Sequence, residues 1–157
     1  MGHTSDFVIT AGRVFCAETG IDGPGSVLIK GNKIESAGAD IEIDSSTAII
    51  DFPDCLIMPG LIDMHAHPAP SDWKYGMDAD SEVLPRGTTT LLSQGDAGTK
   101  VWDQYLEDVI FASEARILMA ISPSVQGESE HRPSLGYMED IDTTQCVNTI
   151  RKGGQHI

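Results

Sequence analysis

The sequence is poor in positive charge and lacks any long apolar run. Only 10 lysine and arginine residues stand against 24 aspartate and glutamate residues, so the formal net charge is −14. Such a surface repels phosphate backbones and anionic lipid, so we expect neither nucleic acid nor a membrane as a partner. No apolar run approaches the roughly 18–20 residues of a membrane-spanning helix, and no basic segment followed by an apolar one marks a secretory signal. We therefore predict a cytoplasmic protein.

Cysteine is also scarce. The sequence has 3 cysteines, Cys16, Cys55 and Cys146, and none of them forms a CxxC pair. An odd, scattered set of this kind argues against a disulfide framework and against a cysteine zinc site. We interpret all three as small buried hydrophobic residues of a protein kept in a reducing compartment.

The first 58 residues favour short strands. Phe7–Cys16 is rich in β-branched and aromatic residues and is interrupted by Gly12. Ser26–Gly38 contains two runs on either side of Gly31-Asn32, as expected for a hairpin with a two-residue turn. Thr47–Phe52 and Cys55–Pro59 are typical of two further strands. Residues 1–58 therefore predict a small all-β unit, the first of two domains.

From residue 59 onward, to 157, strands and helices alternate. The predicted elements are a strand at Leu61–His67, a short helix within Asp78–Gly87, a strand at Thr88–Ser93, a helix with an apolar face at Trp102, Tyr105, Leu106, Val109 and Ile110, a strand at Arg116–Ser122, and a helix from Asp142 as N-cap to Lys152 with Gly153 as its stop. This alternation predicts parallel βαβ units.

Three such units do not close a barrel, and they leave an apolar third strand with an open edge, which folded proteins avoid. We expect the chain to be the N-terminal part of a longer protein. An open sheet completed by a partner chain is the alternative.

A pair of histidines ends the first strand of this alternating region. His65 and His67 are two residues apart, so on an extended backbone they share one face with Asp63. Their Cα atoms would lie roughly 6–7 Å apart, close enough for both ring nitrogens to reach one cation. The carboxyl end of a strand is also where βα folds place their chemistry. The pair therefore predicts half of a metal site.

The segments PGLIDMHAH (residues 59–67) and RGTTTLLSQGDAG (residues 86–98) together resemble the amidohydrolase superfamily of metal-dependent hydrolases. The first is similar to the opening signature of that family, and the second to its usual second strand. The resemblance covers essentially the whole chain. It implies an α/β fold, namely an incomplete (β/α)8 TIM barrel with its first three βα units, preceded by an N-terminal β-sandwich portion.

The resemblance assigns His65 and His67 as the two metal ligands of the first barrel strand. It implies one or two divalent ions, with Zn²⁺ the expected metal, and hydrolysis of C–N bonds in a small-molecule amide or cyclic amide. The family's remaining ligands and its general base come from later strands, so no catalytic residue is assigned within residues 1–157. We expect the fragment to be inactive alone, and the full-length protein to be compatible with a homo-oligomer.

Details of the two segments discriminate between branches of the family. Dihydroorotases usually follow the histidine pair with an arginine, whereas this chain has Pro68-Ala69. The D-aminoacylase branch tends to have a metal-binding cysteine where this chain has Ala97. The turn after the second strand is more similar to that of the deacetylases, and we favour that branch on this turn alone.

Two more residues are predicted at the mouth of the barrel. Asp96 follows the second strand, and His131 lies in the polar loop after the third, so both are candidates for substrate binding. The alternative interpretations are that Asp96 only forms a turn and that His131 is a solvated surface residue. Trp102 and Tyr105 are interpreted as packing residues of a helix.

Two rival interpretations remain at this point. One is a non-catalytic structural relative that keeps the amidohydrolase fold without its metal. The other is a self-contained metal-binding β module, which would have almost no helix, whereas the predicted fold needs about a quarter or more.

Overall fold

Two units make up the chain in the computed structural model, Met1–Pro59 and Gly60–Ile157. The structure describes residues 6–70, 73, 76–129 and 135–157. The division falls beside the predicted boundary between residues 58 and 59. Among the described residues, no helix is long and apolar enough to cross a membrane.

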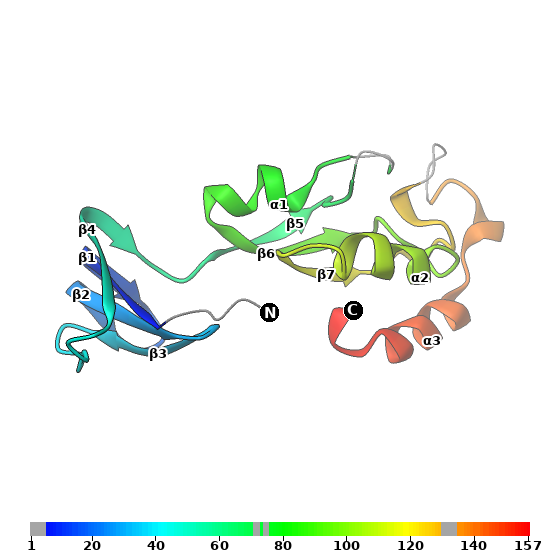
Figure 1. The fold of residues 1–157 in the computed structure, drawn as a ribbon. Coiled ribbons are helices and arrows are strands. Elements are labelled where there is room, and N and C mark those ends of the chain that lie inside the picture. Colours follow the sequence, from blue (N-terminus) through cyan, green and yellow to red (C-terminus); the bar gives the residue numbers. More distant parts are fainter. Residues whose placement is uncertain (1–5, 71–72, 74–75, 130–134) are drawn as a thin grey trace. The chain divides into compact units, whose positions relative to one another are not determined.

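The first unit is a four-stranded sheet with the order β3-β2-β1-β4 (Figure 1). Its strands are β1 (Phe7–Cys16), β2 (Ile21–Lys30), β3 (Lys33–Gly38) and β4 (Ala48–Ile57). β2 and β3 form the predicted hairpin, in which Lys30 pairs with Lys33 across the two-residue turn. Gly31 has a φ of 61°, a conformation that glycine adopts without the steric cost that a Cβ would impose.

The prediction of two separate strands at Thr47–Phe52 and Cys55–Pro59 was wrong, because they form the single strand β4. β4 runs parallel to β1, and the register shifts from the pair Ala11 and Phe52 to the pair Arg13 and Leu56. A Cβ on Gly12 would lie 2.1 Å from the carbonyl oxygen of Pro53. The proline therefore sits in a bulge against Gly12 and does not end the strand.

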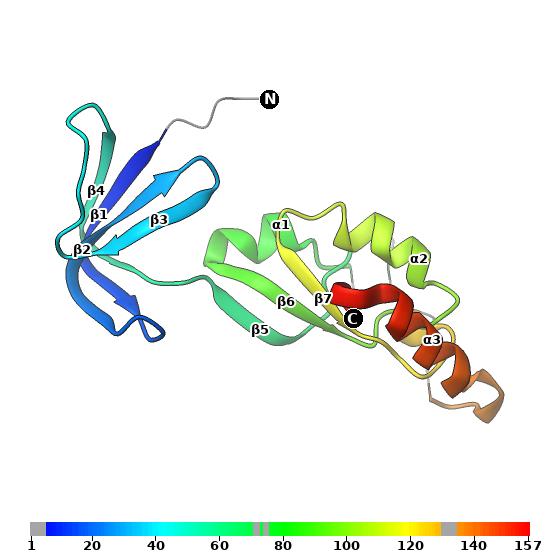
Figure 2. The ribbon, with the colours of Figure 1, turned by 90° about the horizontal axis from the view of Figure 1, so that it is seen from below.

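The second unit contains a parallel sheet with the order β5-β6-β7 (Figure 2). Its strands are β5 (Leu61–Ala66), β6 (Thr88–Gln94) and β7 (Arg116–Ala120). This parallel pairing was predicted from the alternation of strands and helices, and it is confirmed. The protein is thus a mixed α/β chain.

The helices of the second unit follow the predicted positions with two differences. The helices, in chain order, are α1 (Ala79–Glu82) followed by the 3-10 turn η1 (Leu84–Arg86), α2 (Trp102–Tyr105) followed by the π-helical turn η2 (Leu106–Ile110), and α3 (Thr143–Gly153) followed by the 3-10 turn η5 (Gly154–His156). The helix over Trp102–Ile110 is α-helical only in its first turn. α3 begins at the predicted N-cap, where the side chain of Asp142 accepts a hydrogen bond from the amide of Gln145 (2.9 Å).

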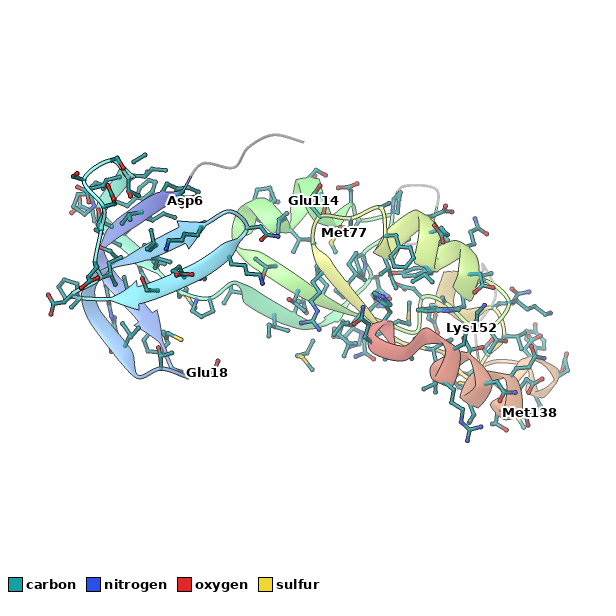
Figure 3. The ribbon with its side chains drawn as sticks, turned by 60° about the horizontal axis from the view of Figure 1, so that its bottom comes forward. Asp6, Glu18, Met77, Glu114, Met138 and Lys152 are labelled. Carbon is teal, nitrogen blue, oxygen red and sulfur yellow. The ribbon has the colours of Figure 1, made fainter. Side chains whose placement is uncertain are left out.

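The predicted stop of this last helix was displaced by one residue. Gly153 is the last residue of α3, and the left-handed residue that ends it is Gly154, with a φ of 56°. Gly153 has a packing role instead, because a Cβ there would lie 2.2 Å from the side chain of Ile157. The end of α3 is also tied to α2, since Lys152, labelled in Figure 3, donates to Asp103 at 2.7 Å.

The core of the second unit lies between one face of its sheet and the segments α1, α2 and η2. Its buried members are Ala66, Ala69, Ala79, Leu91, Ala97, Trp102, Tyr105, Val109, Ile110, Ala115, Ile117 and Met119. Both tryptophans of the chain, Trp73 and Trp102, belong to this unit. Tryptophan fluorescence therefore reports the unfolding of the second unit alone.

Asp80 of α1 ties the start of β7 to the rest of the second unit. Its carboxylate accepts hydrogen bonds from the hydroxyl of Ser113 (2.5 Å) and the amides of Glu114 (2.8 Å) and Ala115 (2.9 Å). Glu114 is labelled in this turn in Figure 3. Burial acts to raise the pKa of Asp80, but the three hydrogen bonds together hold that pKa below its usual value.

We predict that Asp80→Ala lowers the free energy of unfolding of the second unit by about 1–2 kcal/mol at neutral pH. Because the pKa of Asp80 is lower in the native state than in the unfolded state, its ionised carboxylate stabilises the fold. This stabilisation is complete above the unfolded-state pKa of about 3.9 and is lost as the pH falls through the native-state pKa. Urea unfolding followed by tryptophan fluorescence at neutral and acid pH measures both effects.

The control is Asp108→Asn, which changes an exposed aspartate of η2 that accepts one hydrogen bond from Gln104 (3.2 Å). Asp80→Asn should flatten the acid dependence of stability, and Asp108→Asn should leave it close to that of the wild type. Equal acid dependence in the wild type and Asp80→Asn would contradict the prediction.

Candidate metal-binding edge

The two histidines of the HxH pair lie close together at the carboxyl end of β5. His65 is on β5 and exposed, while His67 follows the strand and its side chain is 30% exposed. Their ring centroids are 5.5 Å apart, with an angle of 68° between the ring planes. Two imidazoles that share one tetrahedral zinc ion have centroids about 5 Å apart, given a Zn–N distance of about 2.0 Å. The separation of these rings fits a shared cation.

His67 is held by Asp96, which lies just beyond the carboxyl end of the neighbouring strand β6. The Nδ1 atom of His67 lies 2.5 Å from Oδ1 of Asp96. The parallel register pairs Ala66 with Ser93, so the residues that follow the two strands meet at the same edge of the sheet. An ionised carboxylate can only accept a hydrogen bond, so Nδ1 of His67 carries a proton, and in the neutral form of the ring the lone pair is on Nε2.

This is the arrangement in which a carboxylate orients a metal-binding histidine. The two imidazoles fit a divalent metal as two of its ligands. Among residues 6–70, 73, 76–129 and 135–157, no three His, Cys, Asp or Glu side chains form a metal-binding group.

Asp96 is buried, with 3% of its surface exposed. Its second oxygen, Oδ2, lies 2.7 Å from the hydroxyl of Ser93 and 3.2 Å from that of Tyr105. Both carboxylate oxygens thus have partners within the protein. These contacts favour a role in orienting His67, and the prediction that Asp96 binds substrate stays a prediction.

The other predicted residues are placed as follows. Asp63 is exposed, and its carboxylate accepts a hydrogen bond from the amide of His65 (3.0 Å). The predicted substrate-binding residue His131 lies outside the described residues. The three cysteines are free thiols, but Cys55 is exposed and Cys16 and Cys146 are only partly buried, so the interpretation of all three as buried residues was wrong.

Sequence reasoning missed two residues of this edge, Ser93 and Tyr105. Tyr105 was interpreted as packing, and its ring is indeed buried, but its hydroxyl lies 2.7 Å from the carbonyl oxygen of Pro68. Burial and the nearby Asp96 carboxylate raise the pKa of Tyr105, so the phenol keeps its proton. The helical spacing indicated only that Tyr105 faces the core, and gave no sign of its hydroxyl's partners.

The fold and the edge together define a class: a parallel βα unit that carries an oriented histidine pair at the carboxyl end of its first strand.

No model of a protein family matches the chain. Among curated proteins, it is 40% identical to a dihydroorotase from Syntrophotalea carbinolica over 93% of the chain and 35% of that protein. It is 30% identical to a deacetylase from Agrobacterium fabrum over 83% of the chain and 33% of that protein.

Solved structures agree on the fold. A dihydroorotase crystal structure matches with a TM-score of 0.80 at 23% identity, covering 98% of the chain and 41% of that protein. An adenine deaminase matches with a TM-score of 0.68 at 16% identity, covering 94% of the chain and 39% of that protein.

The chain belongs to the amidohydrolase superfamily. It spans about a third of the length of the two curated relatives named above. These relatives include both a dihydroorotase and a deacetylase, so the preference for the deacetylase branch stays a prediction.

Proposed function

We propose that this chain is the N-terminal portion of a metal-dependent amidohydrolase that cleaves non-peptide C–N bonds in a small-molecule amide or cyclic amide. On this proposal the second unit is the start of a (β/α)8 barrel, and the first is a portion of a β-sandwich. The protein would be cytoplasmic, its partner would be the small-molecule substrate, and the full-length protein would be compatible with a homo-oligomer.

The observation that carries the proposal is the pairing of His65 and His67 with a buried carboxylate. The rings are 5.5 Å apart, and Asp96 accepts a hydrogen bond from His67 at 2.5 Å. A buried carboxylate bonded to one ring nitrogen is the usual partner of a metal-binding histidine. The arrangement therefore favours a metal ligand over a surface residue.

His65 and His67 would hold one or two divalent cations, with Zn²⁺ the best fit to imidazole ligands. A cation held there would supply Lewis-acid activation of the scissile carbonyl and of a water molecule, whose pKa it would lower to about 7. Asp96 would keep the Nδ1 proton of His67 in place, so that Nε2 can act as the ligand. Two neutral ligands hold a divalent cation weakly, because no charged ligand offsets its desolvation.

The substrate class is supported by the relatives' own names. They are a dihydroorotase, a deacetylase, an adenine deaminase and a probable allantoinase. We infer that this chain's reaction belongs to the same group of C–N hydrolyses. The turn after β6 is the feature that favours an acylated amine as the substrate.

The test is a Zn²⁺ titration of the 157-residue chain, followed by NMR of its histidine rings, together with assays on dihydroorotate, allantoin, adenine and N-acetylated amino acids. We expect weak binding that shifts the ring signals of His65 and His67 and leaves His156 unchanged as an internal control. We expect no turnover, because two ligands do not complete a site.

Two results would contradict the proposal in different ways. Rings of His65 and His67 that do not respond to millimolar Zn²⁺ would contradict the metal-binding role. A stable stoichiometric complex with turnover on any of these substrates would contradict the view that the chain needs further residues.

A further inference from the structure

The hydroxyl of Tyr105 lies at the point where three elements of the second unit meet. The residue is on α2 and is fully buried, with 0% of its surface exposed. Its oxygen lies 2.7 Å from the carbonyl oxygen of Pro68, 3.2 Å from Oγ of Ser93 and 3.2 Å from Oδ2 of Asp96. Pro68 directly follows His67, and Asp96 is the partner of the His67 ring.

The number of protons decides the direction of each hydrogen bond. Three contacts of 2.5–2.7 Å each need one proton, and three donors are present: Nδ1–H of His67, the hydroxyl of Ser93 and the hydroxyl of Tyr105. The carbonyl of Pro68 can only accept, so Tyr105 donates to it, and Ser93 then donates to Asp96. The two contacts of 3.2 Å are secondary.

This assignment means that His67 is fixed from two sides. Tyr105 holds the main chain immediately after it, through the Pro68 carbonyl. Asp96 holds its ring, and Asp96 is in turn held by Ser93 and lies against the Tyr105 oxygen. A buried carbonyl without a donor is costly, so removing the tyrosine hydroxyl should let the segment after His67 shift.

We propose that Tyr105 is a positioning residue for His67, which fixes the ring orientation and the tautomer that the metal-binding role requires. The proposal rests on the proposed function, because a metal ligand needs its Nε2 lone pair held in one direction. Tyr105 touches neither the histidine ring nor a substrate in this role. It acts through Pro68 and Asp96.

The rival interpretation is packing alone. The ring of Tyr105 contacts Trp73, with centroids 5.1 Å apart and an angle of 78° between the rings. Phenylalanine at position 105 keeps this contact and removes only the hydroxyl. Tyr105→Phe therefore separates the two interpretations.

The experiment measures the side-chain ¹⁵N signals of the histidines in the 157-residue chain, without metal, at a pH where the imidazoles are neutral. The wild type should show His67 with its proton on Nδ1. Tyr105→Phe should give a mixture of the two tautomers, and Ser93→Ala, which removes the donor to Asp96, should change the population in the same direction. Tyr137→Phe is the matched control, because it makes the same substitution at an exposed residue.

A Zn²⁺ titration of the same variants completes the test. We expect Tyr105→Phe to weaken binding by about tenfold and Tyr137→Phe to leave it unchanged. A variant that unfolds at lower temperature but keeps the wild-type tautomer and affinity would overturn the proposal in favour of packing. The two ideas can also fail separately. If Tyr105→Phe changes the tautomer of His67 but the wild type binds no Zn²⁺, the positioning role of Tyr105 is supported and the proposed function is contradicted.

Discussion

Replacing Gly98 by alanine should lower the free energy of unfolding of the second unit by about 3 kcal/mol or more, among the largest effects expected of a single methyl group. A Cβ on Gly98 would lie 1.9 Å from the carbonyl oxygen of Ser124, 2.5 Å from the carbonyl carbon of Val125 and 2.7 Å from the amide nitrogen of Gly127. All three are main-chain atoms. A side-chain rotation therefore cannot relieve the clash.

The main chain around Gly98 is also held in place by hydrogen bonds. The loops that follow β6 and β7 are joined by bonds from Ser122 N to Ala97 O (3.0 Å), Lys100 N to Val125 O (2.8 Å) and Glu128 N to Gly95 O (2.8 Å). The loops cannot separate to make room for a methyl group without losing some of these bonds. This is why the expected loss is larger than the cost of a surface substitution.

Urea unfolding followed by tryptophan fluorescence is the measurement, since both tryptophans lie in the second unit. The control is Gly87→Ala, where φ is 92° and ψ is 0°, in the left-handed region, and no other part of the chain lies within 4 Å of the added Cβ. That variant carries only the cost of a left-handed alanine, about 1–2 kcal/mol. Equal losses for the two variants would contradict the steric explanation.

The same loop contact bears on the candidate metal-binding edge. Asp96 is two residues before Gly98, and a Cβ on Gly127 would lie 2.6 Å from the carbonyl oxygen of Asp96. The close approach of the two loops thus fixes the main chain that carries the carboxylate. The fold positions Asp96 through backbone contacts, and Asp96 positions His67 through its side chain.

Patterns local in sequence predicted most elements of this fold. Phe7–Cys16 is the observed β1, the hairpin turn is at Gly31-Asn32, and the N-cap of α3 is Asp142, because β-branched runs, turn pairs and capping residues act over a few positions. The β4 bulge could not be predicted in this way. It depends on the approach of Pro53 to Gly12, residues that are distant in sequence.

The candidate metal-binding edge also combines features that local patterns predict with features that they do not. His65 and His67 were found from their spacing, and Asp96 from its place after a strand. Their association required the register of β5 on β6, which no local pattern contains. Tyr105 was assigned to the core by helical spacing, yet its hydroxyl contacts Pro68, 37 positions away in sequence.

Asp96→Ala should weaken Zn²⁺ binding by about 10–100-fold, the usual effect of removing a carboxylate that orients a metal-binding histidine. The substitution removes the acceptor of the His67 Nδ1–H bond (2.5 Å) and of the Ser93 hydroxyl bond (2.7 Å). Without that acceptor, the Nδ1 proton of His67 loses the hydrogen bond that holds it, so the tautomer with the proton on Nε2 becomes more populated. Binding at that nitrogen then requires a tautomer change.

Asp96→Asn separates the orientation of the ring from the negative charge. The amide oxygen can still accept from His67, so this variant should keep the wild-type tautomer and lose less affinity than Asp96→Ala. NMR shifts of the His65 and His67 rings during a Zn²⁺ titration measure a weak dissociation constant directly. If Asp96→Ala binds Zn²⁺ as well as the wild type while its second unit remains folded, the carboxylate has no part in metal binding. The hydrogen bond to His67 would then serve only to fasten the end of β5 to the loop after β6.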